Sequence, residues 1–193
     1  MRAIHNRPKQ FFIGVIAAVC LGVIGSCKPG PSDAELKRES ERRFGAFQMS
    51  LQKELGGAIG KGGFQAAVKH CKIASPALEK KAGGKKFVMK RVSDRPRNPA
   101  HAPDEFERKV LEQWKGILER GGKIATVGER TPTGYRVMKP IRIAGGLCLK
   151  CHGGPEQMDP AAAKEIAKLY PDDKAVGYKV SELRGAFSAV WKD

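Results

Sequence analysis

The chain has 193 residues, with 36 Lys and Arg against 20 Asp and Glu, which gives a formal net charge of +16. Apolar residues make up 41% and charged residues 29%, a balance that is typical of a folded protein and excludes a disordered chain. A polytopic membrane protein is excluded as well, because only one stretch is continuously apolar. The length allows one domain with a sizeable core or a buried cofactor, and five Cys are too few for a disulfide scaffold.

The first 26 residues have the pattern of an export signal. Three basic residues precede an uncharged run over 11–26, and a positive segment before a short apolar stretch is typical of a secretory signal. The run ends Ile24-Gly25-Ser26-Cys27, which resembles the lipobox of bacterial lipoproteins. We therefore expect a signal peptide over 1–26, lipid on Cys27, and a periplasmic, membrane-anchored protein. An uncleaved anchor and an ordinary signal peptide are the alternatives.

Residues 27–34 are predicted to form a tether and residues 35–193 one folded domain. Ser32 or Asp33 could cap a first helix that runs to about Leu55, because its apolar residues share one face. The glycines between 56 and 63 are expected to end this helix. In a second helical stretch from Phe64, Cys71 lies on the apolar face and His70 points about 100° away from it.

The rest of the domain reads as an antiparallel sheet with further helical and loop segments. Residues 87–93 alternate like a strand, three prolines make a stiff loop over 96–103, and a helix follows over 106–118 and closes at Gly121. Strands are predicted over 124–128 and 135–143, and two more short strands in the tail after Tyr178. Strands beside segregated helices predict an α+β fold.

The strongest motif is Cys148-Leu149-Lys150-Cys151-His152, a C-x-x-C-H sequence. This is the attachment motif for c-type haem, in which two thiols form thioethers with the porphyrin and the His binds iron as proximal ligand. Such attachment needs an exported compartment, which the signal supplies independently. The motif predicts one covalent haem c on Cys148, Cys151 and His152.

Two other interpretations of the motif are weaker. A zinc knuckle needs four ligands, and the sequence has no second C-x-x-C. A thioredoxin-like redox pair is also conceivable, but the following Gly153-Gly154-Pro155 does not suggest the usual helix start.

Cys71 is the one thiol left over once Cys20 has gone with the signal and Cys27 has taken lipid. It could be a small hydrophobic residue of the core. It could also bind the far side of the iron as a thiolate, since nearby positive charge lowers a thiol pKa. From position alone His70, His101 and the Met residues compete for that role.

Three segments occur in an order that resembles a known family: A-A-V-K-H-C-K-I-A-S-P-A-L (66–78), R-N-P-A-H-A-P-D-E-F-E (97–107) and C-L-K-C-H-G (148–153). Together with Tyr170-Pro171-Asp172-Asp173 and Gly177-Tyr178, they are similar to bacterial c-type haem domains of unknown function with a PAS-like fold. The similarity covers about residues 35–190. Such domains occur alone or as extracytoplasmic sensors of kinases and chemoreceptors. The resemblance implies a PAS-like antiparallel sheet flanked by helices, and Cys71 as the second axial ligand.

One position departs from the family pattern, because His101 stands where we expect Asn. A benign surface substitution, a partner for a haem propionate and a rival ligand are the three explanations. Arg95 and Arg97 are further candidates for pairing with propionates, since guanidinium matches carboxylate bidentately, although solvated loop arginines are an equally good interpretation. Arg97 and Asn98 are included among the predicted cofactor-binding residues.

With His152 and Cys71 both bound, the iron would have no open position for substrate, so we expect no enzymatic activity. A thiolate stabilises ferric iron and favours low potential. The leading hypothesis is therefore a lipid-anchored monohaem c-type cytochrome for low-potential electron transfer. The alternative is a redox or gas (NO or CO) sensor that signals to a separate partner.

The basic charge is expected to serve docking to an acidic redox partner or to anionic lipid, with a merely solvated surface as the alternative. Cleavage of the signal would remove three positive charges and leave +13 of the +16. Nucleic acid is not expected as a partner, because the protein is exported and its Lys and Arg are scattered. The sequence does not determine the oligomeric state.

Overall fold

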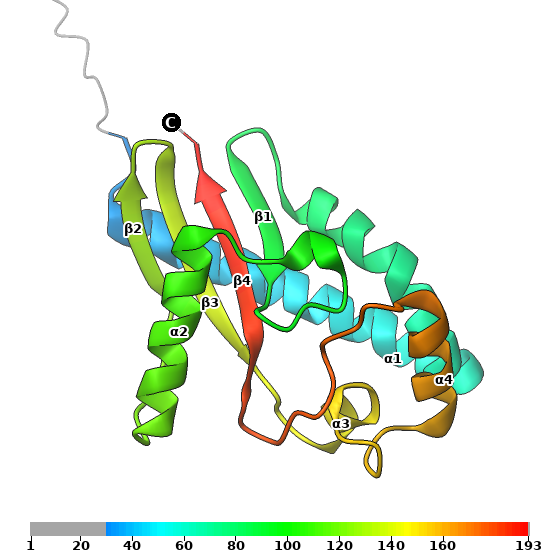
Figure 1. Cartoon of the computed structure of the whole chain (residues 1–193). Coiled ribbons are helices and arrows are strands. Elements are labelled where there is room, and N and C mark those ends of the chain that lie inside the picture. Colours follow the sequence, from blue (N-terminus) through cyan, green and yellow to red (C-terminus); the bar gives the residue numbers. More distant parts are fainter. Residues whose placement is uncertain (1–29, 193) are drawn as a thin grey trace, which may run out of the picture. The chain divides into compact units, whose positions relative to one another are not determined.

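The computed structural model describes residues 30–192 (Figure 1). The predicted signal peptide, Cys27 and the first residues of the tether lie outside them. No helix among the described residues is long and apolar enough to cross a membrane. In chain order the elements are α1 (Asp33–Ala82), β1 (Phe87–Val92), η1 (Pro99–His101), α2 (Glu105–Glu119), β2 (Val127–Thr131), β3 (Gly134–Arg142), α3 (Gly146–His152), α4 (Pro160–Leu169) and β4 (Leu183–Trp191).

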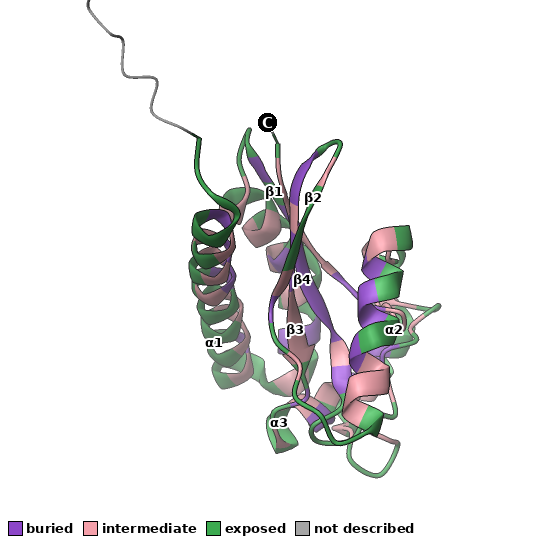
Figure 2. Cartoon of the chain, turned by 90° about the vertical axis from the view of Figure 1, so that its left-hand side faces the viewer, coloured by how far each residue is buried: buried purple, intermediate pink, exposed green. Residues whose placement is uncertain are grey.

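A four-stranded antiparallel sheet in the order β1-β4-β3-β2 forms the centre of the fold. The last strand of the chain thus lies inside the sheet, pairing Phe87 with Trp191 on one side and Tyr135 with Trp191 on the other. Figure 2 shows α1 against one face of this sheet and α2 against the opposite face. The arrangement confirms the α+β class and is consistent with a PAS-like domain.

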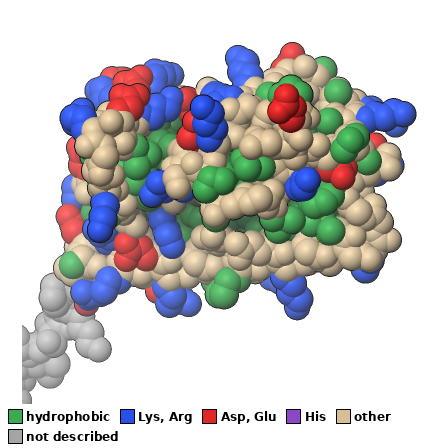
Figure 3. Space-filling view, turned by 90° about the horizontal axis from the view of Figure 1, so that it is seen from below, with side chains coloured by type: hydrophobic (Ala, Val, Ile, Leu, Met, Phe, Trp, Pro, Cys, Tyr) green, Lys and Arg blue, Asp and Glu red, His purple; other side chains and the backbone are tan. Residues whose placement is uncertain are grey.

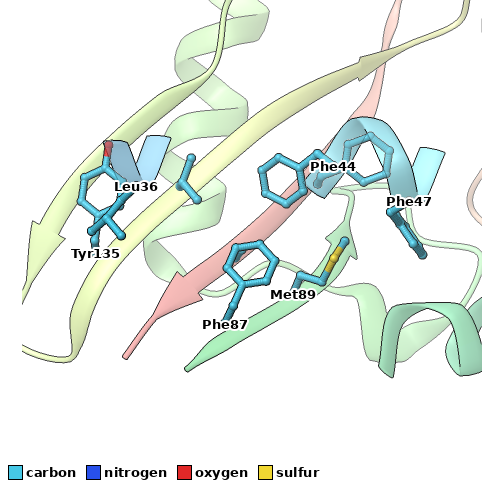
Figure 4. Close-up of a cluster of buried hydrophobic side chains, with 9 residues drawn as sticks. Leu36, Phe44, Phe47, Phe87, Met89 and Tyr135 are labelled. Atoms are coloured by element: carbon cyan, nitrogen blue, oxygen red, sulfur yellow. The ribbon is translucent and has the colours of Figure 1, made fainter. Parts of the chain in front are cut away.

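The main core lies between the first part of α1 and the sheet (Figure 4). Phe44 and Phe47 of α1 contact the ring of Phe187 on β4, and Phe44 also meets Phe87 on β1. These side chains are at most 3% exposed. The rings on α1 recur at helical spacing and therefore share one face of the helix. They pack against rings that point from the strands, and burial of these large side chains explains why α1 covers this face of the sheet.

The first helix begins as predicted but does not end as predicted. Ser32 caps it in a reciprocal capping box with Glu35. The glycines at 56–60 do not terminate it, since each Gly costs a helix only about 1 kcal/mol, which tertiary packing offsets. The helix breaks instead at Gly62 and Gly63, where Gly63 has a φ of 67°, a conformation that favours glycine.

The second part of α1, after Gly63, folds back alongside the first. His70 Nε2 lies 2.7 Å from Glu54 Oε2, although sixteen residues of straight helix would separate them by about 24 Å. This part continues through Pro76 to Ala82. The break therefore brings Cys71 back toward the middle of the molecule.

Two further expectations were wrong. The strand predicted over 124–128 is β2 at Val127–Thr131, and the tail forms one strand rather than two, because Tyr178 and Val180 lie in a loop. The helices α3 and α4 were not predicted. The start of α4 carries a recognisable signal, since Asp159 caps it and Pro160 occupies the first turn.

Candidate cofactor site

A cavity of about 370 Å³ lies between both parts of α1, the loop after β1, the end of β3, α3 and β4. It brings together Cys71, Cys148, Cys151 and His152, which come from segments about 80 residues apart in sequence. Apolar side chains form much of its wall. They are Leu51, Leu55, Ile59, Phe64, Val68, Ile141, Ile143, Leu147 and Phe187.

The C-x-x-C-H residues lie on α3, a short helix that starts after Gly145 and ends at the C-cap Gly153. Cys148 and Cys151 are three residues apart, so the helix presents both thiols on one side. Both are free and half-buried. Leu149 points the other way into a small core with Ile143 and Tyr178, which fixes the helix against the domain.

His152 is held with one ring nitrogen engaged and the other left for a ligand. Its Nδ1 lies 2.8 Å from the carbonyl oxygen of Ala175, and a carbonyl can only accept, so Nδ1 carries the proton. Burial, followed by the nearby Arg184 and Arg97, lowers the pKa of His152 well below its ordinary value. The neutral ring therefore keeps a lone pair on Nε2, which is what metal coordination requires.

Arg97 lines the cavity, as the predicted cofactor role requires, but its guanidinium is already engaged by the protein. Nε donates to Asp173, and Nη2 donates to the carbonyl oxygens of Cys151 and Ala175, at 2.6 and 3.3 Å. Because Ala175 also accepts from His152, Arg97 holds the motif helix and the histidine's partner in one network. In this structure Arg97 acts as a positioning residue.

Asn98 also lines the cavity, and its side chain accepts from the backbone N–H of Ala100 to cap η1. Arg95, the other loop arginine considered, is absent from the lining. Its guanidinium lies 4.1 Å from the Tyr178 ring and donates to the carbonyl oxygens of Lys174 and Val176. Asn98 therefore shapes the wall, and Arg95 supports the loop behind it.

The candidates for the distal ligand are separated by their surroundings. His70 lies outside the cavity lining, against Glu54. His101 lines the cavity, but its Nε2 is 3.2 Å from Glu79. No Met of the described chain contributes to the lining. Cys71 lines it half-buried, and burial raises the pKa of its thiol while Arg91 acts in the opposite direction.

Every charged residue that lines the cavity is basic, and only Arg97 among them was predicted from the sequence as a cofactor-binding residue. No Asp or Glu belongs to the lining within residues 30–192, whereas five cations do: Lys72, Arg91, Arg97, Arg142 and Arg184. Nor do three or more His, Cys, Asp or Glu side chains of that part of the chain come together as a metal site.

The fold and the site define a class of protein, an α+β domain with a cofactor cavity beside a C-x-x-C-H helix. The Tll0287-like family matches residues 34–191, and the chain belongs to this family. The crystal structure of the cyanobacterial haem-protein Tll0287 is similar with a TM-score of 0.53 and 19% identity, over 80% of this chain and 96% of that chain. A search of curated proteins finds no match. The resemblance drawn from the motifs is confirmed at the level of the family.

Proposed function

We propose that this protein is a periplasmic, lipid-anchored monohaem c-type cytochrome that transfers electrons at low potential. Cys148 and Cys151 hold the haem covalently, His152 is the proximal ligand, Cys71 the distal ligand, and Cys27 carries the lipid. The observation that carries the proposal is that Cys71, Cys148, Cys151 and His152 line one cavity. The solved relative is described as a haem protein.

The residues of the cavity fit a haem in three respects. The wall is largely apolar, as a porphyrin ring requires. The charged lining is wholly basic, which suits a ligand that carries two carboxylates. A neutral His152 with a free Nε2 faces the same space as the two thiols of the motif. Bound there, the haem supplies one-electron redox chemistry.

Cys71 serves best as a thiolate, because the thiolate is the form that binds metal. Burial alone works against ionisation of this thiol, and Arg91 works in favour of it. A thiolate donates strongly and therefore favours the ferric state, so the reduction potential is low. With both axial positions taken by protein side chains, no site remains for substrate, and we propose no enzymatic activity.

Docking to an acidic redox partner suits the strongly basic mature chain, which keeps +13 of the net charge of +16 after cleavage of the signal. Figure 3 views the end of the molecule that carries α3, where hydrophobic side chains gather between Lys and Arg. Leu147 of α3 both lines the cavity and is 58% exposed. A partner at this end would approach the cofactor closely, with a salt-dependent rate.

Covalent attachment can be tested on the mature protein made in a host that exports and attaches haem c. We expect the colour to stay with the polypeptide through acid-acetone extraction and the intact mass to include one haem. A Cys148→Ser/Cys151→Ser variant should lose both signals, and the matched Cys71→Ser variant should keep them, because Cys71 makes no thioether. A wild-type mass without the haem would overturn the proposal.

The alternative function, a redox or gas sensor, is supported by one feature of the fold. Cys71 lies on the part of α1 that follows the glycine break at Gly62 and Gly63. Release of the Cys71 thiolate would remove one contact that holds this part, and a shift of this part together with α4, on which it packs, would turn about the break. Such a shift is what a sensor needs to signal to a separate partner.

The two functions predict different behaviour of the reduced protein. For a carrier we expect rapid electron exchange with a soluble cytochrome in stopped-flow mixing and no change of spectrum under CO. A sensor should instead bind CO or NO, with a new absorption band and slow exchange. The Cys71→Ala variant is the control for gas access, since it lacks the side chain that blocks the site. CO binding by the wild type would favour the sensor.

A further inference from the structure

Arg184 enters the cavity from an irregularity in the sheet. Along the β3–β4 pair, Ile141 is opposite Gly185 and Arg142 is opposite Leu183, so Arg184 is the extra residue of a bulge. Gly185 beside it has a φ of 154°, and a Cβ there would collide with the carbonyl oxygen of Val92. Bulges redirect a side chain that a regular strand would place elsewhere.

The surroundings of Arg184 differ from those of the other guanidinium groups deep in the cavity wall. Arg91 pairs with Glu79 and Arg97 pairs with Asp173. Arg184 has no carboxylate within salt-bridge distance among residues 30–192. Its Nη1 makes a long contact, 3.4 Å, to the carbonyl oxygen of Arg95.

The Nε of Arg184 is buried and has no hydrogen-bond partner within the described chain. A guanidinium does not lose its proton in proteins. Arg184 is half-buried, and a charge withdrawn from water without a counter-charge is unfavourable. The Tyr178 ring, 5.5 Å away, offers only a weak cation–π contact. An anion from outside the described chain would supply the missing counter-charge.

We propose that Arg184 binds a carboxylate of the cavity's ligand, and that this carboxylate is a haem propionate. The inference rests on the proposed function and adds a binding residue to it. Guanidinium and carboxylate match in a bidentate pair, and such a pair supplies the counter-charge that the described chain does not provide to Arg184. Because Arg91 and Arg97 already have acidic partners, Arg184 is the cavity guanidinium most in need of one.

The test follows the reduction potential of the mature haem-loaded protein as a function of pH. An ionised propionate favours the ferric state, so the potential falls as pH rises through the propionate pKa. A paired guanidinium lowers a carboxylate pKa by about one unit or more. We call this pH-dependent fall of the potential the step. In Arg184→Gln we expect the step to move upward by about one pH unit or more, with the low-spin absorption spectrum unchanged.

Arg142→Gln is the matched control, because Arg142 lines the same cavity but is exposed and donates to the carbonyl oxygen of Ser181. Its step should stay at the wild-type pH. Arg184→Lys keeps the charge without the bidentate geometry, so its step should lie above the wild-type pH and below that of Arg184→Gln. If Arg184→Gln does not accumulate, an upward shift in Arg184→Lys supports the pairing.

Several results would overturn the assignment. The pairing is contradicted if the potential of Arg184→Gln changes at the wild-type pH. The same outcome in Arg184→Lys contradicts it where only that variant accumulates. If Arg142→Gln shifts the step as much as Arg184→Gln, the cause is the general charge of the cavity and not a pairing with Arg184. In both cases the wild type still contains haem, so the proposed function survives. A wild type without haem overturns both proposals.

Discussion

Replacement of Cys71 by Ala is expected to convert the ferric protein from six-coordinate low-spin to high-spin and to raise its reduction potential. The thiolate binds ferric iron more tightly than ferrous iron, and each tenfold preference lowers a one-electron potential by about 59 mV. Loss of a hundredfold preference would raise the potential by about 120 mV. EPR, absorption spectra and a redox titration of the mature protein measure these changes.

The controls for this prediction are the two histidines that compete in sequence. His70→Ala and His101→Ala should leave the low-spin spectrum as it is, because Glu54 and Glu79 engage these rings. An unaltered spectrum in Cys71→Ala would contradict the assignment. The histidine whose removal changes the spectrum would then take the role.

Replacement of Arg97 by Met is expected to lower the free energy of unfolding by about 3 kcal/mol. The change leaves Asp173, whose side chain is only 7% exposed, without its ion-pair partner. It also removes the donor to the carbonyl oxygens of Cys151 and Ala175. Guanidinium unfolding of the ferric protein measures the loss. Since Ala175 orients His152, a broader low-spin EPR signal should accompany it.

Lys109→Met is the matched control for loss of an ion pair. Lys109 and Glu105 form an exposed pair one helical turn apart, with side chains 68% and 80% exposed. Such an exposed pair contributes little to stability, because water and salt screen it. Equal destabilisation by the two variants would contradict the positioning role of Arg97, and so would an Arg97→Met protein as stable as the wild type.

Local patterns predicted several elements well because their signals are short-range. The cap at Ser32, the strand β1 and the helix α2 follow from a capping residue, alternation and helical spacing. Elements that depend on distant packing were missed or misplaced. The glycines before Gly62 stay helical because the first part of α1 packs on the sheet. β2 takes its position from pairing with β3, with Val127 opposite Met138.

The candidate site divides in the same way. The C-x-x-C-H motif consists of neighbouring residues, so roles for Cys148, Cys151 and His152 could be predicted without knowledge of the tertiary structure. The motif gave no indication that Arg97 would pair with Asp173, 76 residues later, and orient the helix. Nor could it indicate Arg184, which lines the cavity from a bulge in β4.

The sequence by itself determined the chemistry of this protein: two thiols and an imidazole at the spacing of haem attachment, a further Cys on an apolar helix face, and the family. Only the tertiary structure decided which side chains share the cavity. The glycine break in α1 turns Cys71 toward α3. Glu54 engages His70 outside the cavity, and Glu79 engages His101 in the cavity wall. The physical reason is that the motif depends on covalent spacing along a few residues, whereas the cavity depends on long-range packing.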